Sequence, residues 1–181
     1  MIYCRLDLNN LYDHGRIARL QVSGVGQFPV FTGNGAYINH PECSMLPNAA
    51  IPPGDYWIVD RPKGGIKSDL TQMGKSIYTG NNYNQWFGLY RKDATLDDYM
   101  KFQRSGVTWQ RGNFRMHPLR PDGTGLSDGC ITFYHQADFA TVRRALLMTR
   151  NMVVLSTGTV AYGEVTVIGQ LDEACTLQEP G

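Results

Sequence analysis

Residues 113–135 read NFRMHPLRPDGTGLSDGCITFYH, and this stretch contains two short segments that alternate between apolar and polar residues. In residues 114–117 the alternation has a period of two, which is typical of a strand and places Arg115 and His117 on one face. Residues 130–133 alternate in the same way. The stretch therefore predicts two neighbouring strands.

The segment between these strands, residues 118–128, is rich in Pro, Gly, Asp and Ser, a composition typical of a loop. If the strands pair as a hairpin, His117 and Cys130 lie near each other at the mouth of this loop. A cysteine attacks as its thiolate, so a catalytic cysteine needs a nearby base, and His117 is the candidate.

The residues before Cys130 are suited to supporting such chemistry. Gly129 permits a tight backbone, so the amides of Gly129 and Cys130 are candidates for stabilising an oxyanion. Ser127 is a candidate for holding the loop or orienting the imidazole. Single buried cysteines and lone histidines are more often structural, so the prediction depends on their combination.

The pattern resembles a known catalytic signature. His117 followed by Ser127-Asp128-Gly129-Cys130-Ile131 resembles the His…Ser-x-Gly-Cys signature of the L,D-transpeptidase (YkuD-type) catalytic domain. More specifically, three upstream runs resemble the type VI secretion L,D-transpeptidase effectors, which attack peptidoglycan in rival bacteria: FPVFTGNG at 28–35, NHP at 39–41 and IPPGDYWIVDR at 51–61.

The resemblance implies both a fold and an activity. The fold is mainly β with minor α, a single L,D-transpeptidase-like β-sandwich or barrel domain over residues 1–181 with one helix after the catalytic cysteine. The implied activity is antibacterial: Cys130 attacks the L,D bond of tetrapeptide stems, releasing D-alanine or exchanging it for another D-amino acid. No cofactor is expected. The implied partners are peptidoglycan stem peptides, a cognate immunity protein and the secretion machinery.

Three further residues are candidates for binding substrate. Arg115 shares a strand face with His117, and its planar guanidinium suits the terminal carboxylate of a stem peptide. Tyr83 and Trp86 are expected at the rim of the groove. Asp128, within the backbone expected to hold the oxyanion, stands where the wider family often has histidine or another residue. Pro118 stands where many relatives have glycine, which leaves the third catalytic element open.

Composition excludes some classes of protein. The 181 residues carry a net charge of +1 and no block of Lys or Arg, which argues against nucleic-acid binding. The N-terminus has no basic region followed by an apolar one, and no apolar run approaches the roughly 20 residues of a membrane span. We therefore expect a protein made in the cytoplasm without a signal peptide; the resemblance to the type VI effectors implies that it is then secreted and acts in the periplasm of a target bacterium.

The four cysteines lack the Cys-x-x-Cys spacing of a metal site. His40 and Glu42 have no second spaced pair to support a metal centre, so no metal is expected. If Cys130 is a free nucleophile, Cys4 can pair with Cys175 should the terminal strands be adjacent. Three unpaired buried thiols remain the alternative.

The rest of the chain reads mainly as strands. They are expected at 2–8, 17–23, 27–32, 56–59, 86–91, 153–155 and 161–168, and residues 107–110 are expected to lead into the strand at 114–117. Helices are expected at 95–104 and 136–149, with a short one near 66–75.

Two other functions compete with the main prediction. Papain-like cell-wall amidases and endopeptidases also use cysteine and histidine, but their cysteine precedes their histidine, the reverse of the order here. The second alternative is a non-catalytic peptidoglycan-binding module that keeps the fold.

Overall fold

The computed structural model describes residues 1–60, 85–93, 95–104, 106–120, 123, 127–150, 152–156, 158–170 and 175. Within these residues the strands are β1 (Ile2–Asp7), β2 (Ala18–Val22), β3 (Gly26–Phe31), β4 (Gly54–Asp60), β5 (Phe87–Arg91), β6 (Tyr99–Arg104), β7 (Val107–Gly112), β8 (Arg115–Pro118), β9 (Ile131–Phe133), β10 (Val153–Val154) and β11 (Val160–Ile168). The α-helix is α2 (Gln136–Met148), and two 3-10 helices are η1 (Gly35–Tyr37) and η2 (Pro41–Cys43). None of the helices in these ranges is long and apolar enough to cross a membrane.

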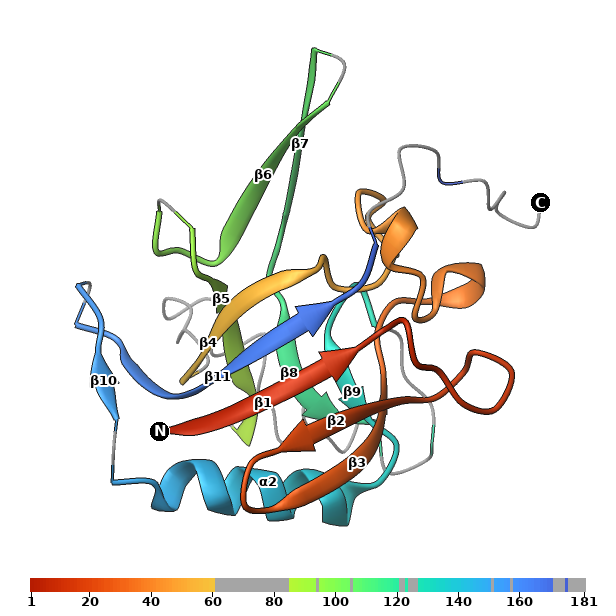
Figure 1. The fold of residues 1–181 in the computed structure, drawn as a ribbon. Coiled ribbons are helices and arrows are strands. Elements are labelled where there is room, and N and C mark those ends of the chain that lie inside the picture. Colours follow the sequence, from red (N-terminus) through yellow and green to blue (C-terminus); the bar gives the residue numbers. More distant parts are fainter. Residues whose placement is uncertain are drawn as a thin grey trace.

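The main sheet closes on itself into a barrel. Its strand order is β1-β2-β3-β9-β8-β5-β4-β11-β10, and β1 also pairs with β11, so eight of the described strands form a ring (Figure 1). The β1–β11 and β8–β9 pairs are parallel, and the other pairs in the ring are antiparallel. Closure removes exposed edges from the ring. The predicted mainly β fold with minor α is confirmed.

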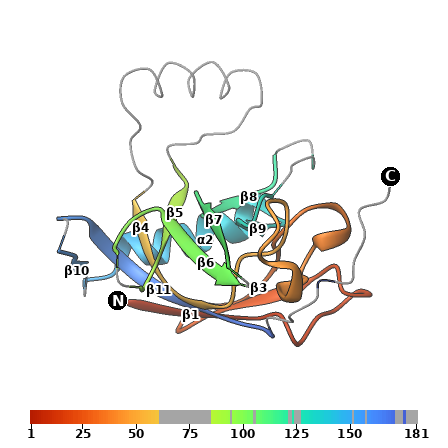
Figure 2. The ribbon, with the colours of Figure 1, turned by 90° about the horizontal axis from the view of Figure 1, so that it is seen from above.

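Alternating burial along the strands fills the barrel. In β11 every second residue from Ala161 to Val167 is buried. The helix α2 covers one end of the ring, where Phe139, Val142 and Leu146 join the core. These residues recur at helical spacing, which explains why the helix was predicted at almost these bounds. Figure 1 shows α2 at the opposite end of the molecule from β6 and β7, and in Figure 2, which is seen from above, α2 lies behind them.

The predicted helix at 95–104 is wrong, because this segment enters strand β6, which pairs with β7. Asp93 and Asp97, which resemble helix-capping residues in the sequence, instead accept hydrogen bonds from the backbone N–H groups of Thr95 and Tyr99 at 3.1 and 2.8 Å. Such bonds to a residue two positions on form turns. In β6 the buried Met100 lies between exposed Tyr99 and Lys101, a strand-like alternation.

The two strands that carry the predicted catalytic residues do not form a hairpin. β8 and β9 are adjacent but parallel, with His117 opposite Thr132 and Met116 opposite Ile131. Parallel neighbours need a crossover of roughly a dozen residues, and residues 119–130 supply it. Local sequence patterns predict each strand well, but they do not reveal the direction in which two strands pair.

The helix predicted near 66–75 and Tyr83 lie outside the described residues. The remaining predicted strands, apart from small shifts at their ends, match the observed elements.

Candidate active site

His117 lies in β8 with only 6% of its surface exposed. Its Nδ1 is 2.9 Å from the carbonyl oxygen of Pro118, the next residue. A carbonyl oxygen only accepts hydrogen bonds, so Nδ1 carries the proton and donates it. In the neutral imidazole this tautomer leaves Nε2 as the basic nitrogen. The Pro118 carbonyl therefore orients the ring, and it is a candidate for the third catalytic element that the sequence left open.

Trp86 packs flat on His117. The two ring centroids are 4.1 Å apart and the ring planes are inclined by 15°. Strand register explains the contact: β5 and β8 are antiparallel partners, with Phe87 opposite Met116, so the residue before β5 reaches the position of His117. The half-buried side chain of Trp86, which was predicted at the rim of the groove, thus packs against one face of the His117 ring.

Cys130 lies on the same face as His117. It directly precedes β9, and its side chain is partly accessible. Because Thr132 is opposite His117 in the parallel pair, Cys130, two residues earlier, falls on the same face of the sheet. The intervening Ile131 points into the core. The backbone N–H of Arg115 donates to the sulfur, which lies 4.0 Å from the carbonyl oxygen of Asn113.

The thiol of Cys130 is held in its neutral form. Burial raises its pKa from 9.0 to about 11, against the lowering effect of the Arg115 amide and of the charges on Arg115 and Arg111. The charge of Asp128 raises the pKa further. The structure therefore favours a neutral thiol at neutral pH over a preformed pair of thiolate and imidazolium.

The loop before Cys130 has a defined shape. Ser127 is 1% exposed and its hydroxyl donates to the Cys130 carbonyl at 2.8 Å, so it holds the loop, the first of the two roles predicted for it. Asp128 points its carboxylate to solvent. Gly129 has φ +94°, a conformation that favours glycine. A Cβ at Gly129 would lie 2.5 Å from the Arg111 guanidinium and 2.8 Å from the Phe114 ring, so the loop also needs glycine for space.

Arg115 is engaged within the protein. Its Nη1 and Nη2 each lie 2.6 Å from a carboxylate oxygen of Asp98, a bidentate pair that leaves the two side chains 11% and 15% exposed. A substrate carboxylate would have to displace Asp98, so the expected substrate contact does not fit this arrangement. What Arg115 does supply to the site is its backbone N–H, which reaches the sulfur.

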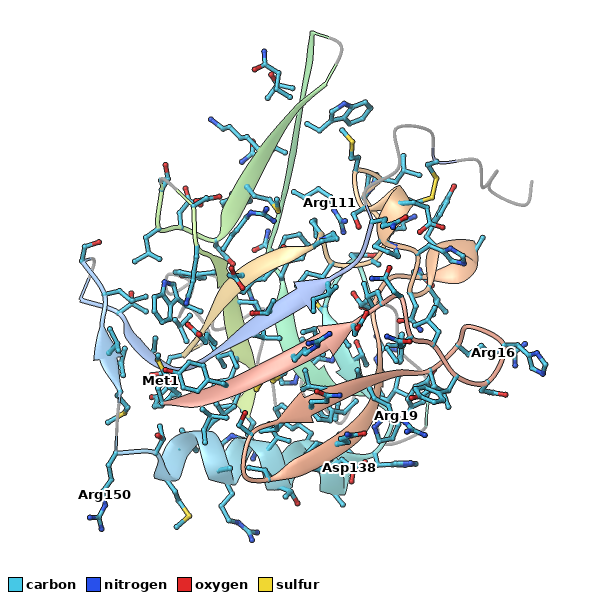
Figure 3. The ribbon with its side chains drawn as sticks, viewed as in Figure 1. Met1, Arg16, Arg19, Arg111, Asp138 and Arg150 are labelled. Atoms are coloured by element: carbon cyan, nitrogen blue, oxygen red, sulfur yellow. A yellow bond between two sulfur atoms is a disulfide. The ribbon has the colours of Figure 1, made fainter. Side chains whose placement is uncertain are left out.

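Arg111, at the end of β7, was not singled out from the sequence. Its guanidinium donates to the carbonyl oxygens of Ser44, Pro47, Ala49 and Ala50, and to that of Asp128 beside the cysteine. Figure 3, where Arg111 is labelled, shows it beside the segment that carries η1 and η2. A single arginine in a strand has no distinctive pattern. The sequence signal for this contact was in the loop that accepts its hydrogen bonds, residues 44–50, where Pro47 supplies a carbonyl group but no N–H group.

The cysteines pair differently from the sequence prediction. Cys43 of η2 and Cys175 form a disulfide, while Cys4 and Cys130 are free. Cys4 does lie next to the last strand, because β1 is adjacent to β11, but its direct neighbour there is Val165. By Gly169 the chain has already reached Pro41, since a Cβ on that glycine would lie 2.6 Å from the proline ring. Cys175 therefore meets η2 and not β1.

The barrel places His117 and Cys130 on one face of two neighbouring strands, which makes them a candidate thiol–imidazole site in a β domain. A family model described as the Tlde1 domain matches residues 26–157, which include every described residue of this site. The chain therefore belongs to the Tlde1 family, the type VI secretion L,D-transpeptidase effectors. A comparison with curated proteins finds no match.

Proposed function

We propose that residues 1–181 act as one catalytic domain, a cysteine-dependent L,D-carboxypeptidase and L,D-transpeptidase that modifies tetrapeptide stems of peptidoglycan. The observation that carries this proposal is the arrangement of His117. Its Nδ1 proton is held by the Pro118 carbonyl, and its ring shares a sheet face with Cys130. Family membership supports the class of substrate.

The proposed reaction begins with a neutral thiol. With a pKa of about 11, only about one Cys130 in ten thousand is ionised at pH 7. Nε2 of His117 takes the thiol proton as the sulfur bonds to the carbonyl carbon of the L,D bond. The negative charge that develops on the carbonyl oxygen is stabilised by the amides of Gly129 and Cys130.

The second half of the reaction releases the product. The tetrahedral intermediate collapses, the carbon–nitrogen bond breaks, and the nitrogen of D-alanine receives the proton from Nε2. A thioester then joins the stem to Cys130. Water attacks this thioester to complete a carboxypeptidase cycle, or the amine of another D-amino acid attacks it to complete an exchange. In both cases His117 accepts the nucleophile's proton and returns a proton to the sulfur.

We further propose that the protein is secreted and acts as a toxin in the periplasm of a target bacterium, where a cognate immunity protein neutralises it. Membership of a type VI effector family supports this setting. The Cys43–Cys175 disulfide also fits it, because disulfides persist in oxidising compartments such as the periplasm and are rare in the cytosol.

The proposal is tested by incubating purified tetrapeptide muropeptides with four proteins: the wild type, Cys130→Ala, His117→Gln and, as a matched control, Cys4→Ala. Cys4 is the other free cysteine and is buried in β1. Mass analysis should find D-alanine released by the wild type and Cys4→Ala only. With D-methionine added, an exchanged stem should appear in the same two samples.

Two results would contradict the proposal. Cleavage between L-alanine and D-glutamate would indicate an amidase or endopeptidase, and binding of muropeptides without any cleavage would indicate a binding module. A covalent carbapenem adduct on Cys130 of the wild type, found by peptide mapping, would independently support a reactive thiol.

A further inference from the structure

Arg111 is a buried cation whose contacts need an explanation. It is 6% exposed, and among the described residues no carboxylate forms an ion pair with it. Burial lowers its pKa to about 10, which still leaves it charged at neutral pH. Burying a charge without a counter-ion is unfavourable unless hydrogen bonds compensate. The hydrogen bonds recorded for its guanidinium all go to main-chain carbonyl groups, and the Phe114 ring lies 5.1 Å from it.

These carbonyl groups belong to two different segments. Four are in the 44–50 loop, at distances of 2.5 to 3.3 Å from the two terminal nitrogens. The fifth is the carbonyl of Asp128, 3.1 Å from Nη2. The same nitrogen lies against Gly129, where a Cβ would be only 2.5 Å away. Arg111 thus joins the 44–50 loop to the backbone immediately before Cys130.

This contact sets the direction of one peptide group. In a trans peptide the N–H points opposite to the C=O, and the structure has no cis peptide bonds among the described residues. Because the Asp128 carbonyl points at Arg111, the N–H of Gly129 points away from Arg111. At the other end of the segment, the Ser127 hydroxyl holds the Cys130 carbonyl. The backbone around Gly129 is therefore fixed from both sides.

We propose that Arg111 is a positioning residue for the reaction: its guanidinium aims the Gly129 amide at the developing oxyanion, and its charge stabilises the ionised Cys130 sulfur and that oxyanion. The role deepens the proposed function and rests on it. A planar fork is needed for the first effect, because several donors must reach both segments at once. The second effect needs only a positive charge. The two effects are separable by substitution.

The test compares Arg111→Lys, which keeps the charge but loses the fork, with Arg111→Met, which loses both. Arg91→Lys is the matched control. Arg91 similarly donates to a loop carbonyl, that of Pro53 at 3.0 Å, and lies against a glycine, Gly54, but it does not contact the cysteine loop. Thermal unfolding of each protein establishes that it folds before any kinetic comparison.

Two kinetic measurements follow. The first is kcat and KM for D-alanine release. We expect Arg111→Lys to lower kcat by about 10² while KM stays within about twofold, as for removal of one oxyanion donor. Arg91→Lys should keep both. The second is the rate of Cys130 alkylation by iodoacetamide between pH 7 and 9, where Arg111 carries its charge, with the site located by peptide mapping. Here Arg111→Lys should match the wild type, and Arg111→Met should react more slowly at each pH.

A folded Arg111→Lys protein with wild-type kcat would overturn the positioning role. A folded Arg111→Met protein with an unchanged alkylation profile would overturn the electrostatic role; if Arg111→Met does not fold, Arg111→Gln replaces it. Alkylation requires no peptidoglycan, so this second measurement tests Arg111 even if the wild type releases no D-alanine. Failure of the proposed function is thereby distinguished from failure of this inference.

Discussion

The indole of Trp86 and the imidazole of His117 are stacked, with their centroids 4.1 Å apart and their planes inclined by 15°. The contact joins the residue before β5 to the middle of β8, two strands that are paired in the barrel wall. The stacked indole keeps the imidazole ring from tilting out of its plane. The hydrogen bond from Nδ1 to the Pro118 carbonyl limits rotation of the ring within that plane. Together the two contacts give His117 a single orientation.

Replacing Trp86 with leucine should therefore slow catalysis. Aromatic pairs of this kind contribute roughly 0.5–1.5 kcal/mol, which corresponds to a decrease of up to about tenfold in kcat if the whole restraint acts on the reactive geometry. Trp86→Phe should retain most of the activity. Trp57→Leu, in β4, removes a tryptophan that packs under Lys92, and it should leave kcat unchanged. Equal activity of Trp86→Leu and the wild type would argue against this role.

The raised pKa of Cys130 predicts how the rate of its alkylation depends on pH. A thiol whose pKa is about 11 is protonated at neutral pH, so its alkylation by iodoacetamide should accelerate about tenfold per pH unit up to that value. A Cys4→Ala background removes the other free thiol from the measurement. A rate that reaches a plateau near pH 7 would contradict this prediction and would indicate a preformed thiolate–imidazolium pair.

Two glycines with similar φ angles allow the cost of backbone strain to be measured separately from the cost of side-chain crowding. Gly123 has φ +77° and nothing within 4 Å of an added Cβ, whereas Gly129 has φ +94° and is crowded by Arg111 and Phe114. Gly123→Ala should lower the free energy of unfolding by about 1–2 kcal/mol through backbone strain alone. Gly129→Ala should cost about 1–3 kcal/mol more through overpacking, and should also abolish most D-alanine release.

Urea unfolding and the D-alanine assay check both glycine variants. Equal losses of stability in the two proteins would contradict the close contact between Gly129 and the Arg111 guanidinium.

The burial of the Cys4 thiol predicts that the protein loses stability at alkaline pH. Burial raises its pKa from 9.0 to about 12. Below pH 9 both the native and the unfolded chain hold the thiol proton, so stability does not depend on Cys4. Between pH 9 and about 12 the unfolded chain has lost this proton and the native chain has kept it. The free energy of unfolding should therefore fall as pH rises, by about 1.4 kcal/mol per unit.

Urea titrations from pH 8 to 10.5 measure this slope. Both proteins compared should carry Cys130→Ala, so that the second thiol does not contribute, and one should also carry Cys4→Ala. The Cys4→Ala protein should have the shallower dependence on pH. Identical slopes would mean that Cys4 is not desolvated as the structure indicates.

Sequence patterns predicted those parts of the fold in which one periodicity dominates. The apolar stripe of α2 and the strict alternation of β11 are strong because each packs against the core over its whole length. The segment that ends in β6 misled the prediction because aspartates form turns and helix caps by similar hydrogen bonds. Pairing direction, as for the parallel neighbours β8 and β9, is set by the arrangement of the whole sheet and is not a local property of either segment.

The same distinction applies to the site. Residue type and spacing singled out His117 and Cys130 as candidates, and the structure places both on one face of the sheet. The contact of His117 with the Pro118 carbonyl and the contacts of the Arg111 guanidinium were not predicted, because their acceptors are main-chain carbonyl groups, which every residue possesses. Trp86 was predicted as a site residue, but its contact with the imidazole depends on the register between β5 and β8.

The parallel contact between β1 and β11 has a consequence for biosynthesis. It joins the opening and final strands of the barrel, with Ile2 opposite Gly163 and Asp7 opposite Ile168. A nascent chain still attached to the ribosome therefore cannot complete the ring until residues 163–168 of β11 have emerged. Contacts this distant along the chain slow folding, so the unfinished polypeptide spends longer with its sheet edges unprotected.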